Sequence, residues 1–247
     1  NITFEATSLK DNTVPIGNAT ATDIQQVTIT NNASKTFPLG KSTILWIAKD
    51  VSGNVSNGTQ TIDVVDTTAP KITAPSAVNT IAESISGNIV PIGNATATDG
   101  VKLVSLTNNA SKTFPLGKTT ILWVATDEAG NKANATQIVD VENTTPPKLT
   151  IPADITFEAT SLNNNTIPLG NATATDIEQV TITNNAPKQF PLGKTSILWI
   201  ATDASGNKAN ATQTVDVIHT VPPKLTVPDN ITFEATSLKD NTVPIGN

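Results

Sequence analysis

A pattern that occurs three times constrains the fold of this chain more than any other feature. The pentapeptide FPLGK begins at Phe37, Phe114 and Phe190, which lie 77 and 76 residues apart. The ILW tripeptide keeps the same spacings, ending at Trp46, Trp123 and Trp199, and the NATATD hexapeptide ends at Asp23, Asp99 and Asp176, which lie 76 and 77 residues apart. A period of this length is typical of tandem structural units. The sequence therefore predicts three copies of one domain.

Proline-containing linkers mark the predicted boundaries. The sequences TTAP, TTPP and TVPP begin at Thr67, Thr144 and Thr220. Proline restricts the backbone and removes a hydrogen-bond donor, which favours short, stiff connections. We expect a domain over 1–66 that lacks its first strand, domains over 67–143 and 144–219, and the opening strands of a fourth domain over 220–247.

Within one unit, short β-rich segments alternate with turn signals. We predict strands at residues 148–151, 154–160, 179–183, 196–202 and 211–218. In the last of these, Gln213, Val215 and Val217 alternate with polar residues, which indicates a half-buried strand, whereas the apolar ILWIAT run indicates a central strand. About seven strands per unit favour an all-β fold of tandem immunoglobulin-like sandwiches, each with two packed antiparallel sheets.

The stretch FPLGKTTILWVATDEAGNKANATQIVDVENTTPP, from Phe114 to Pro147, resembles the hyalin repeat (HYR) domain family of extracellular modules. The resemblance implies an HYR-type immunoglobulin-like fold and an adhesive or spacer role on a surface protein. It also implies two cysteines per domain, where this chain has Ile151 or Val227 and Ala135 or Ala211. The resemblance thus implies an extracellular or cell-surface protein, and because these bridging cysteines are absent we expect it to come from a prokaryote, archaeal or bacterial.

The two ends of the chain match, since residues 1–18 recur letter for letter at 230–247, an offset of 229 residues. Two explanations stay open: a continuous polyprotein with a three-domain super-repeat, or a joint in which the last strands of one chain complete the first domain of the next. Either one predicts self-association or continuation into an extracellular filament or surface array. The alternative is an adhesin or spacer stalk, for which the second unit, with its shifted 78–88 region and extra residue around 100–106, is the candidate.

Charge and composition argue against other function classes. The net charge is −6, arginine is absent, and the lysines are scattered singly, so no basic surface for nucleic acid is expected. No apolar run approaches the roughly 20 residues of a membrane-spanning helix. The single histidine, His219, has no nucleophile or metal-ligand companions in the sequence around it, and we therefore predict no enzymatic activity.

Recurring carboxylates are the candidate metal ligands. Glutamates recur at Glu5, Glu83, Glu158 and Glu234. The candidate calcium ligands are the recurring aspartates Asp23, Asp50, Asp99, Asp127, Asp176 and Asp203. The alternative is that each DxxGN sequence is a hairpin turn, with Gly and Asn at positive φ and Asp capping backbone amides. The linker position occupied by Asp66, Asn143 and His219 does not keep its charge, which favours the turn over a metal cofactor.

Asparagine sequons and tryptophans complete the candidate sites. Asn-x-Ser/Thr acceptors predict covalently linked glycans at Asn18, Asn32, Asn54, Asn57, Asn94, Asn109, Asn134, Asn143, Asn164, Asn171 and Asn210. The single tryptophan of each unit is expected to anchor the core of its sandwich, the alternative being a stacking platform for sugars. Each FPLG segment is expected to form a turn with a buried phenylalanine.

Overall fold

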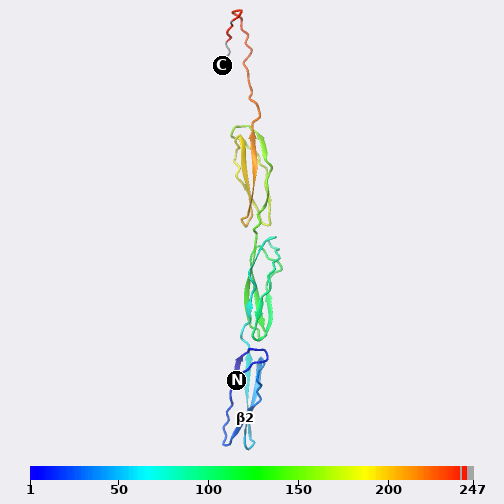
Figure 1. Ribbon diagram of the computed structural model, residues 1–247, viewed down its shortest axis with the longest axis vertical. Coiled ribbons are helices and arrows are strands. Elements are labelled where there is room, and N and C mark those ends of the chain that lie inside the picture. The colour runs from blue at the N-terminus through cyan, green and yellow to red at the C-terminus, as the bar shows by residue number, and fades with distance from the viewer. Residues whose placement is uncertain (240, 244–247) are drawn as a thin grey trace. The chain divides into compact units, whose positions relative to one another are not determined.

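The computed structural model describes residues 1–239 and 241–243, and all regular elements within them are β-strands (Figure 1). The all-β fold predicted from the sequence is therefore confirmed. The chain forms two compact units. Unit 1 comprises Asn1–Pro147, Thr175–Val180 and Thr202–Asn207, and unit 2 comprises Lys148–Ala174, Thr181–Ala201 and Lys208–Asn247.

Unit 1 contains the sheets of the first two repeats. The first repeat has one sheet, ordered β1-β4-β3-β2, with strands at Ile2–Glu5, Val55–Val65, Gly40–Asp50 and Val27–Asn31. The second has the matching sheet β6-β10-β9-β8, at Val78–Ile81, Lys132–Glu142, Gly117–Asp127 and Leu103–Asn108. A second, two-stranded sheet pairs β5 (Lys71–Thr73) with β7 (Thr96–Thr98). The extra residue of the second repeat produces an irregularity in β8 between Leu103 and Ser105.

The strands of the third repeat follow the same plan. Its larger sheet has the order β12-β16-β15-β14, at Ile155–Glu158, Lys208–Ile218, Gly193–Thr202 and Thr181–Asn184. β11 (Lys148–Thr150) pairs with β13 (Thr173–Thr175) in a second sheet. The ILWIAT strand is central, between β16 and β14, as predicted. The three-residue strand β13 was not predicted, because TAT is too short to show a period.

The expectation of purely antiparallel sheets is wrong for the opening strand of each four-stranded sheet. β1 pairs with β4, β6 with β10 and β12 with β16, and all three pairs are parallel. In the second and third repeats the opening segment begins in the two-stranded sheet, as β5 or β11, and then crosses to the larger sheet. There it lies beside the last strand of its own repeat. The crossing makes the two strands run in the same direction.

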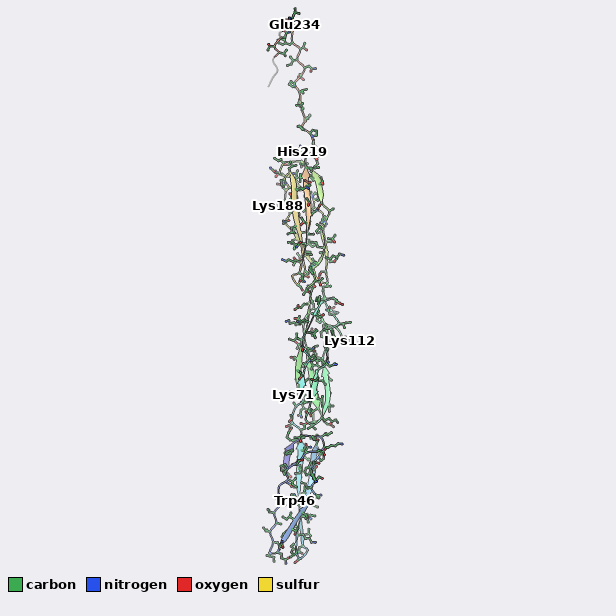
Figure 2. All side chains as sticks on the ribbon, in the orientation of Figure 1. Trp46, Lys71, Lys112, Lys188, His219 and Glu234 are labelled. Atoms are coloured by element: carbon green, nitrogen blue, oxygen red, sulfur yellow. The ribbon has the colours of Figure 1, made fainter. Side chains whose placement is uncertain are left out.

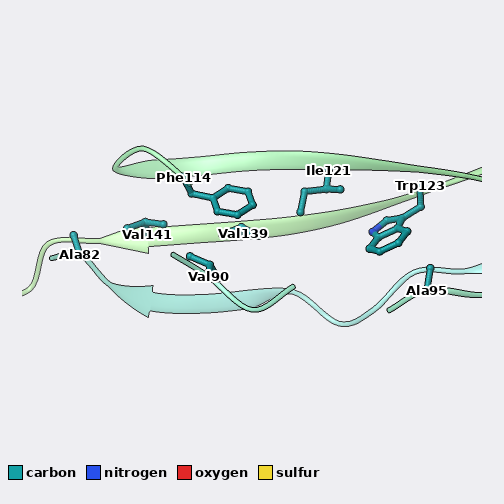
Figure 3. Close-up of a cluster of buried hydrophobic side chains, with 8 residues drawn as sticks. All are labelled: Ala82, Val90, Ala95, Phe114, Ile121, Trp123, Val139 and Val141. Carbon is teal, nitrogen blue, oxygen red and sulfur yellow. The ribbon is translucent and has the colours of Figure 1, made fainter. Parts of the chain in front are cut away.

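Alternate residues of the central strands build each core. In the second repeat Phe114, Ile121, Trp123, Val139 and Val141 pack against one another (Figure 3). The FPLG phenylalanines are buried as predicted, at 4%, 2% and 2% exposure for Phe37, Phe114 and Phe190. Trp123 and Trp199 are also buried, which confirms their role as core anchors. Trp46 of the first repeat is only half-buried.

A buried glutamine in each complete repeat bonds the tryptophan of the neighbouring strand and two loop carbonyls. Gln213 of β16 accepts a hydrogen bond from Trp199 Nε1 at 3.0 Å. Its Nε2 donates to the backbone carbonyl of Ala153 at 2.8 Å and to that of Leu169 at 3.1 Å. Gln137 makes the equivalent bonds to Trp123, Ser76 and Ile92. The amide thus satisfies one carbonyl where the opening segment changes sheet and a second carbonyl in the loop that precedes β13 or β7.

A buried asparagine closes the long loop of each repeat. Asn165 has no exposed surface, and its Oδ1 accepts from the amides of Thr160 and Ser161 at 2.9 and 3.1 Å. Its Nδ2 donates to the carbonyls of Ser161 and Phe190 at 2.7 and 2.9 Å. Asn12 and Asn88 do the same in the other repeats. The backbone around the buried phenylalanine is therefore fixed by one side chain.

The DxxGN turns are hairpins, as the sequence predicts. Gly53, Gly130 and Gly206 have φ values of 93°, 92° and 90°. The asparagines do not share this conformation, because all positive φ angles of the described residues belong to glycine, and this part of the expectation is wrong. Instead, the asparagine bonds the aspartate: Asn54 donates to Asp50 from its backbone amide and from Nδ2, both at 2.8 Å.

We expect Gly53→Ala to destabilise the first repeat by about 1–2 kcal/mol, because a Cβ atom is strained in the left-handed region. Gly58→Ala is the matched control. Both glycines have open space where a Cβ would lie, but only Gly53 has a positive φ. Hydrogen exchange of β3 and β4 peptides, resolved by mass spectrometry, measures the change. Equal effects of the two variants would contradict conformational strain as the cause.

Candidate functional site

Two groups of acidic side chains are brought together in unit 1, and each contains residues predicted as calcium ligands. The first, which we name the Asp66 cluster, consists of Asp66, Asp99 and Asp127, each with a carboxylate oxygen within 4.8 Å of the others. The second, the Asn143 cluster, consists of Asp176, Glu178 and Asp203 around Asn143. Both groups form where a linker residue follows the last strand of one repeat.

In the Asp66 cluster, the turn geometry supplies most hydrogen bonds. Asp127 ends β9 and accepts from the backbone amide and Nδ2 of Asn131 at 2.8 and 2.9 Å. Asp99 follows β7, and its Oδ2 accepts from the amides of Val101 and Lys102, both at 2.8 Å. Asp66 follows β4, and its Oδ1 accepts from the amide of Thr68 at 3.2 Å. Burial raises the pKa of Asp66, and the negative charges of Asp127 and Asp99 raise it further.

The Asn143 cluster has an amide where the first cluster has a carboxylate. Asn143 Nδ2 lies 3.1 Å from Asp176 Oδ1, 2.9 Å from Glu178 Oε2 and 3.1 Å from Asp203 Oδ2. Asn143 is 6% exposed. Hydrogen bonds from Ser205 and then from Asn143 lower the pKa of Glu178. The acidic groups are therefore held together by a neutral donor.

The remaining calcium candidates, Asp23 and Asp50, are not brought into such a group among the described residues. Asp23 Oδ1 accepts from the amide of Gln25 at 2.9 Å, and Asp50 is bonded to Asn54. The hydrogen bond from the Asn54 side chain is the main cause that lowers the pKa of Asp50. In the first repeat these aspartates stabilise turns. Sequence reasoning set aside Asp66 and Asn143 because the linker position does not keep its charge, and it missed Glu178, whose equivalent position is not acidic in every repeat.

A different glutamate contact fixes two of the linkers. Glu5 accepts from the amide and hydroxyl of Thr67 and the hydroxyl of Thr68, each at 2.8 Å. Glu158 accepts in the same way from the amide and hydroxyl of Thr220, both at 2.8 Å. The grouping of Glu83 with these glutamates is wrong. Ile81 pairs with the last residue of β10, as Glu5 and Glu158 pair with the last residues of β4 and β16. Glu234 lies in the exposed segment after β16 (Figure 2).

We expect the contact between Glu158 and Thr220 to weaken in acid. The backbone amide of Thr220, followed by its hydroxyl, lowers the pKa of Glu158 from its ordinary 4.5. The folded state therefore favours the carboxylate, so the contact is complete above pH 4.5 and is lost as the pH falls through the lowered pKa. Carbon NMR titration of the Glu158 carboxyl should give a midpoint below 4.5.

Thr220→Val should move this midpoint upward, because it removes the hydroxyl donor. Thr212→Val, on the exposed face of β16, is the control. A Glu158 midpoint that is the same in all three chains would contradict the assignment. His219 lies next to this contact, with Nδ1 3.5 Å from Glu158 Oε1 (Figure 2). The structure thus places the single histidine beside a linker carboxylate.

The predicted glycan acceptors divide into one buried and ten exposed residues. Asn143 is buried and its Nδ2, the atom that carries an N-linked glycan, is used in hydrogen bonds, so it is not retained as an acceptor. The exposed acceptors are Asn18, Asn32, Asn54, Asn57, Asn94, Asn109, Asn134, Asn164, Asn171 and Asn210. The Nδ2 of Asn54 donates to Asp50.

The first repeat has a cleft of about 580 Å³ beside its half-buried tryptophan. The segment Ala19–Asp23 forms one wall, and Ile29, Trp46 and Val55 from β2, β3 and β4 contribute to the others. In the next repeat the equivalent TAT sequence forms β7, which pairs with the opening strand β5. No described strand pairs with residues 20–22. The cleft thus lies where the other repeats hold their opening strand.

Among the described residues no helix is long and apolar enough to cross a membrane.

Comparisons with known proteins place these features in a family. The HYR domain pattern matches residues 65–141 and 142–217, together more than half of the chain. Hyalin of Lytechinus variegatus is 35% identical over 216 residues, which are 78% of this chain and 40% of that protein. Hyalin of Strongylocentrotus purpuratus is 36% identical over 217 residues, 81% of this chain and 18% of that protein. A serine-rich adhesin for platelets of Staphylococcus aureus (strain MSSA476) is 28% identical over 219 residues, 79% of this chain and 9% of that protein.

The chain spans less than half the length of each of these relatives. They indicate an extracellular or cell-surface repeat module, as predicted. They do not support the predicted prokaryotic origin, because the hyalins come from sea urchins. The resemblance noted in the FPLGK to TTPP stretch is confirmed by two tandem matches. The chain belongs to the HYR domain family.

Proposed function

We propose that this chain is a non-catalytic structural component of an extracellular filament or cell-surface array, built from HYR domains in a 229-residue super-repeat. The observation that carries the proposal is the match between the cleft of the first repeat and residues 224–226. This chain would then contribute four parts of the array: three domains, over 1–66, 67–143 and 144–219, and the start of a fourth at 220.

The cleft and the segment fit by sequence and by chemistry. Lys224–Thr226 reads KLT, as does β11, whose Leu149 packs against the core of its own repeat. Leu225 and Val227 are 83% and 70% exposed in the described structure. Covering such side chains is favourable by roughly 25 cal/mol per Å² of apolar surface. A strand added at an open edge also gains main-chain hydrogen bonds, which fix its register.

A segment of this sequence can reach the cleft in two ways, as a preceding part of one longer chain or as part of another copy. Cryo-electron microscopy of native material should show continuous fibres with an axial period of three domains. Density that runs without a break into Asn1 would indicate a polyprotein. Density that enters the cleft from a second chain would indicate a donor strand. Separate short chains without fibres would overturn the filament proposal.

Strand addition to the cleft can also be tested with a peptide, without native fibres. A peptide of residues 221–230 added to the full chain should shift Trp46 fluorescence to the blue, because Trp46 lies in the cleft wall and is half-buried, whereas Trp123 and Trp199 are already buried. The same peptide with Leu225→Asp and Val227→Asp is the control. A shift caused equally by both peptides, or by neither, would contradict strand addition.

We further propose that glycans modify the ten exposed acceptors. Their side chains face solvent, where an attached glycan would shield open strand edges. Peptide mass spectrometry of native material should find hexose-containing masses on several of them and none on Asn143. Unmodified asparagine at every acceptor would end this part of the proposal.

An adhesin or spacer stalk is the second candidate function. The 28% identity to a staphylococcal adhesin over 219 residues favours it. The lack of cysteine in the sequence still favours a prokaryotic cell surface. The sequence has no arginine and its lysines are scattered singly, which disfavours nucleic acid as a partner. In this case the domains would set the distance between a binding part and the surface, and purified chains would remain separate.

A further inference from the structure

The Asp66 cluster contains a buried oxygen for which the fold supplies no donor. Asp66 is 8% exposed, and its Oδ2 is a buried side-chain oxygen without a hydrogen-bond partner among the described residues. An unpaired polar group in the interior costs about 1–3 kcal/mol, and a charged one costs more. This oxygen belongs to a carboxylate whose neighbours are also carboxylates. No side chain among the described residues supplies a partner for it.

The nearest basic side chain does not neutralise the cluster. Lys102 donates its backbone amide to Asp99, but its Nζ pairs with Glu128, 2.5 Å away. The described ion pairs include none to Asp66, Asp99 or Asp127. Two of the three carboxylates are nearly fully buried, Asp127 at 2% exposure and Asp66 at 8%. Like charges at this separation repel one another strongly in a partly buried site.

The Asn143 cluster shows how the same arrangement is balanced when a donor is present. Asn143 and Asp66 both follow the last strand of a repeat, and both bond the amide two residues on, at Thr145 or Thr68. Asp203 and Asn207 repeat the geometry of Asp127 and Asn131. At Asn143 the amide nitrogen, with two N–H donors, lies within hydrogen-bond distance of an oxygen of each of the three acidic groups. At Asp66 an acceptor lies in that place, and a cation would have to supply the positive charge.

We propose that Asp66, Asp99 and Asp127 bind one hard divalent cation of the calcium class, with Asp66 Oδ2 as a direct ligand. Carboxylate oxygens are the preferred ligands of Ca²⁺, and three carboxylates supply up to six of its six to eight oxygens, with water completing the shell. The Asn143 cluster binds no cation, because the amide of Asn143 occupies the centre of its acidic groups. The acidic side chains are thus held together by a cation in the Asp66 cluster and by the amide of Asn143 in the Asn143 cluster.

The test measures calcium binding to the full chain by isothermal titration calorimetry. We expect one Ca²⁺ per chain, with a dissociation constant in the 10⁻⁴ to 10⁻³ M range or tighter. Asp66→Asn should weaken binding by about 10-fold or more. This variant is expected to fold, because the Asn143 cluster already accommodates asparagine at this position. Asp50→Asn, in the repeat whose aspartates are not clustered, is the matched control and should leave binding unchanged.

The reverse substitution makes the test independent of how Asp66→Asn folds. Asn143→Asp replaces the internal donor with a carboxylate and should create a second calcium site, giving two ions per chain. Hydrogen exchange should locate the sites, with calcium slowing exchange at residues 66–68 and 99–102 in the unmodified chain but not at 143–145. Absence of binding at millimolar Ca²⁺, full binding by Asp66→Asn, or unchanged stoichiometry in Asn143→Asp would each overturn the proposal.

Discussion

Asn165→Ala should destabilise the third repeat by about 3–5 kcal/mol, since a buried group left unpaired costs about 1–3 kcal/mol and several are affected at once. Asn165 is completely buried and makes four hydrogen bonds to backbone groups. Three of them fix Thr160 and Ser161, before the asparagine, and the fourth reaches the carbonyl of Phe190 across the repeat. The substitution therefore opens the loop and the edge of the core together.

Hydrogen exchange of β15 and β16 peptides in the full chain measures this change for one repeat at a time. Asn164→Ala is the matched control, since its side chain is exposed, and we expect a change within about 0.5 kcal/mol. A cost below about 1 kcal/mol for Asn165→Ala would mean that water satisfies the released groups. In that case the asparagine would not be the element that closes the loop.

Gln213→Leu should destabilise the third repeat by about 2–4 kcal/mol, because it removes three hydrogen bonds while nearly preserving side-chain volume. The carbonyls of Ala153 and Leu169 and the indole N–H of Trp199 would all lose their partner. The added apolar surface offsets part of the loss. Thr212→Val, on the opposite face of β16, keeps the strand pattern and should have little effect.

A double-mutant cycle separates the tryptophan bond from the two carbonyl bonds. Trp199→Phe in the Gln213→Leu chain removes the orphaned N–H, so the two substitutions together should cost less than the sum of the separate costs, by about 1 kcal/mol. Strict additivity would show that the indole bond contributes little. The cost of Gln213→Leu would then come mainly from the two backbone carbonyls, Ala153 and Leu169.

Periodicity made the larger part of the fold predictable. The alternation from Gln213 to Val217 and the fixed places of Phe190 and Trp199 identify the buried faces without any three-dimensional information. The parallel pairing of the opening strand was not predictable in this way. Alternation tells which face of a strand is buried, but it carries no information about the direction of the neighbouring strand.

The acidic sites were only partly predictable, for two reasons. The recurring aspartates Asp99 and Asp127 were found because repeats can be compared with one another. Asp66 and Asn143 were set aside because their charge differs, although both lie among acidic side chains at the same position after the last strand of a repeat. Glu83 was misplaced because the second repeat is offset locally, so that similar letters do not occupy equivalent positions.

The parallel pairing of the opening and closing strands has a mechanical consequence. Because β12 and β16 run in the same direction, a pull on the chain before Ile155 and after Ile218 acts at opposite ends of the pair. Such a pull slides one strand along the other and strains all four residue pairs, from Ile155 with Val215 to Glu158 with Ile218, at the same time. A hairpin pulled from its open end would instead lose its residue pairs one after another. In each repeat the four parallel residue pairs therefore bear the tension together, so they must break at the same time.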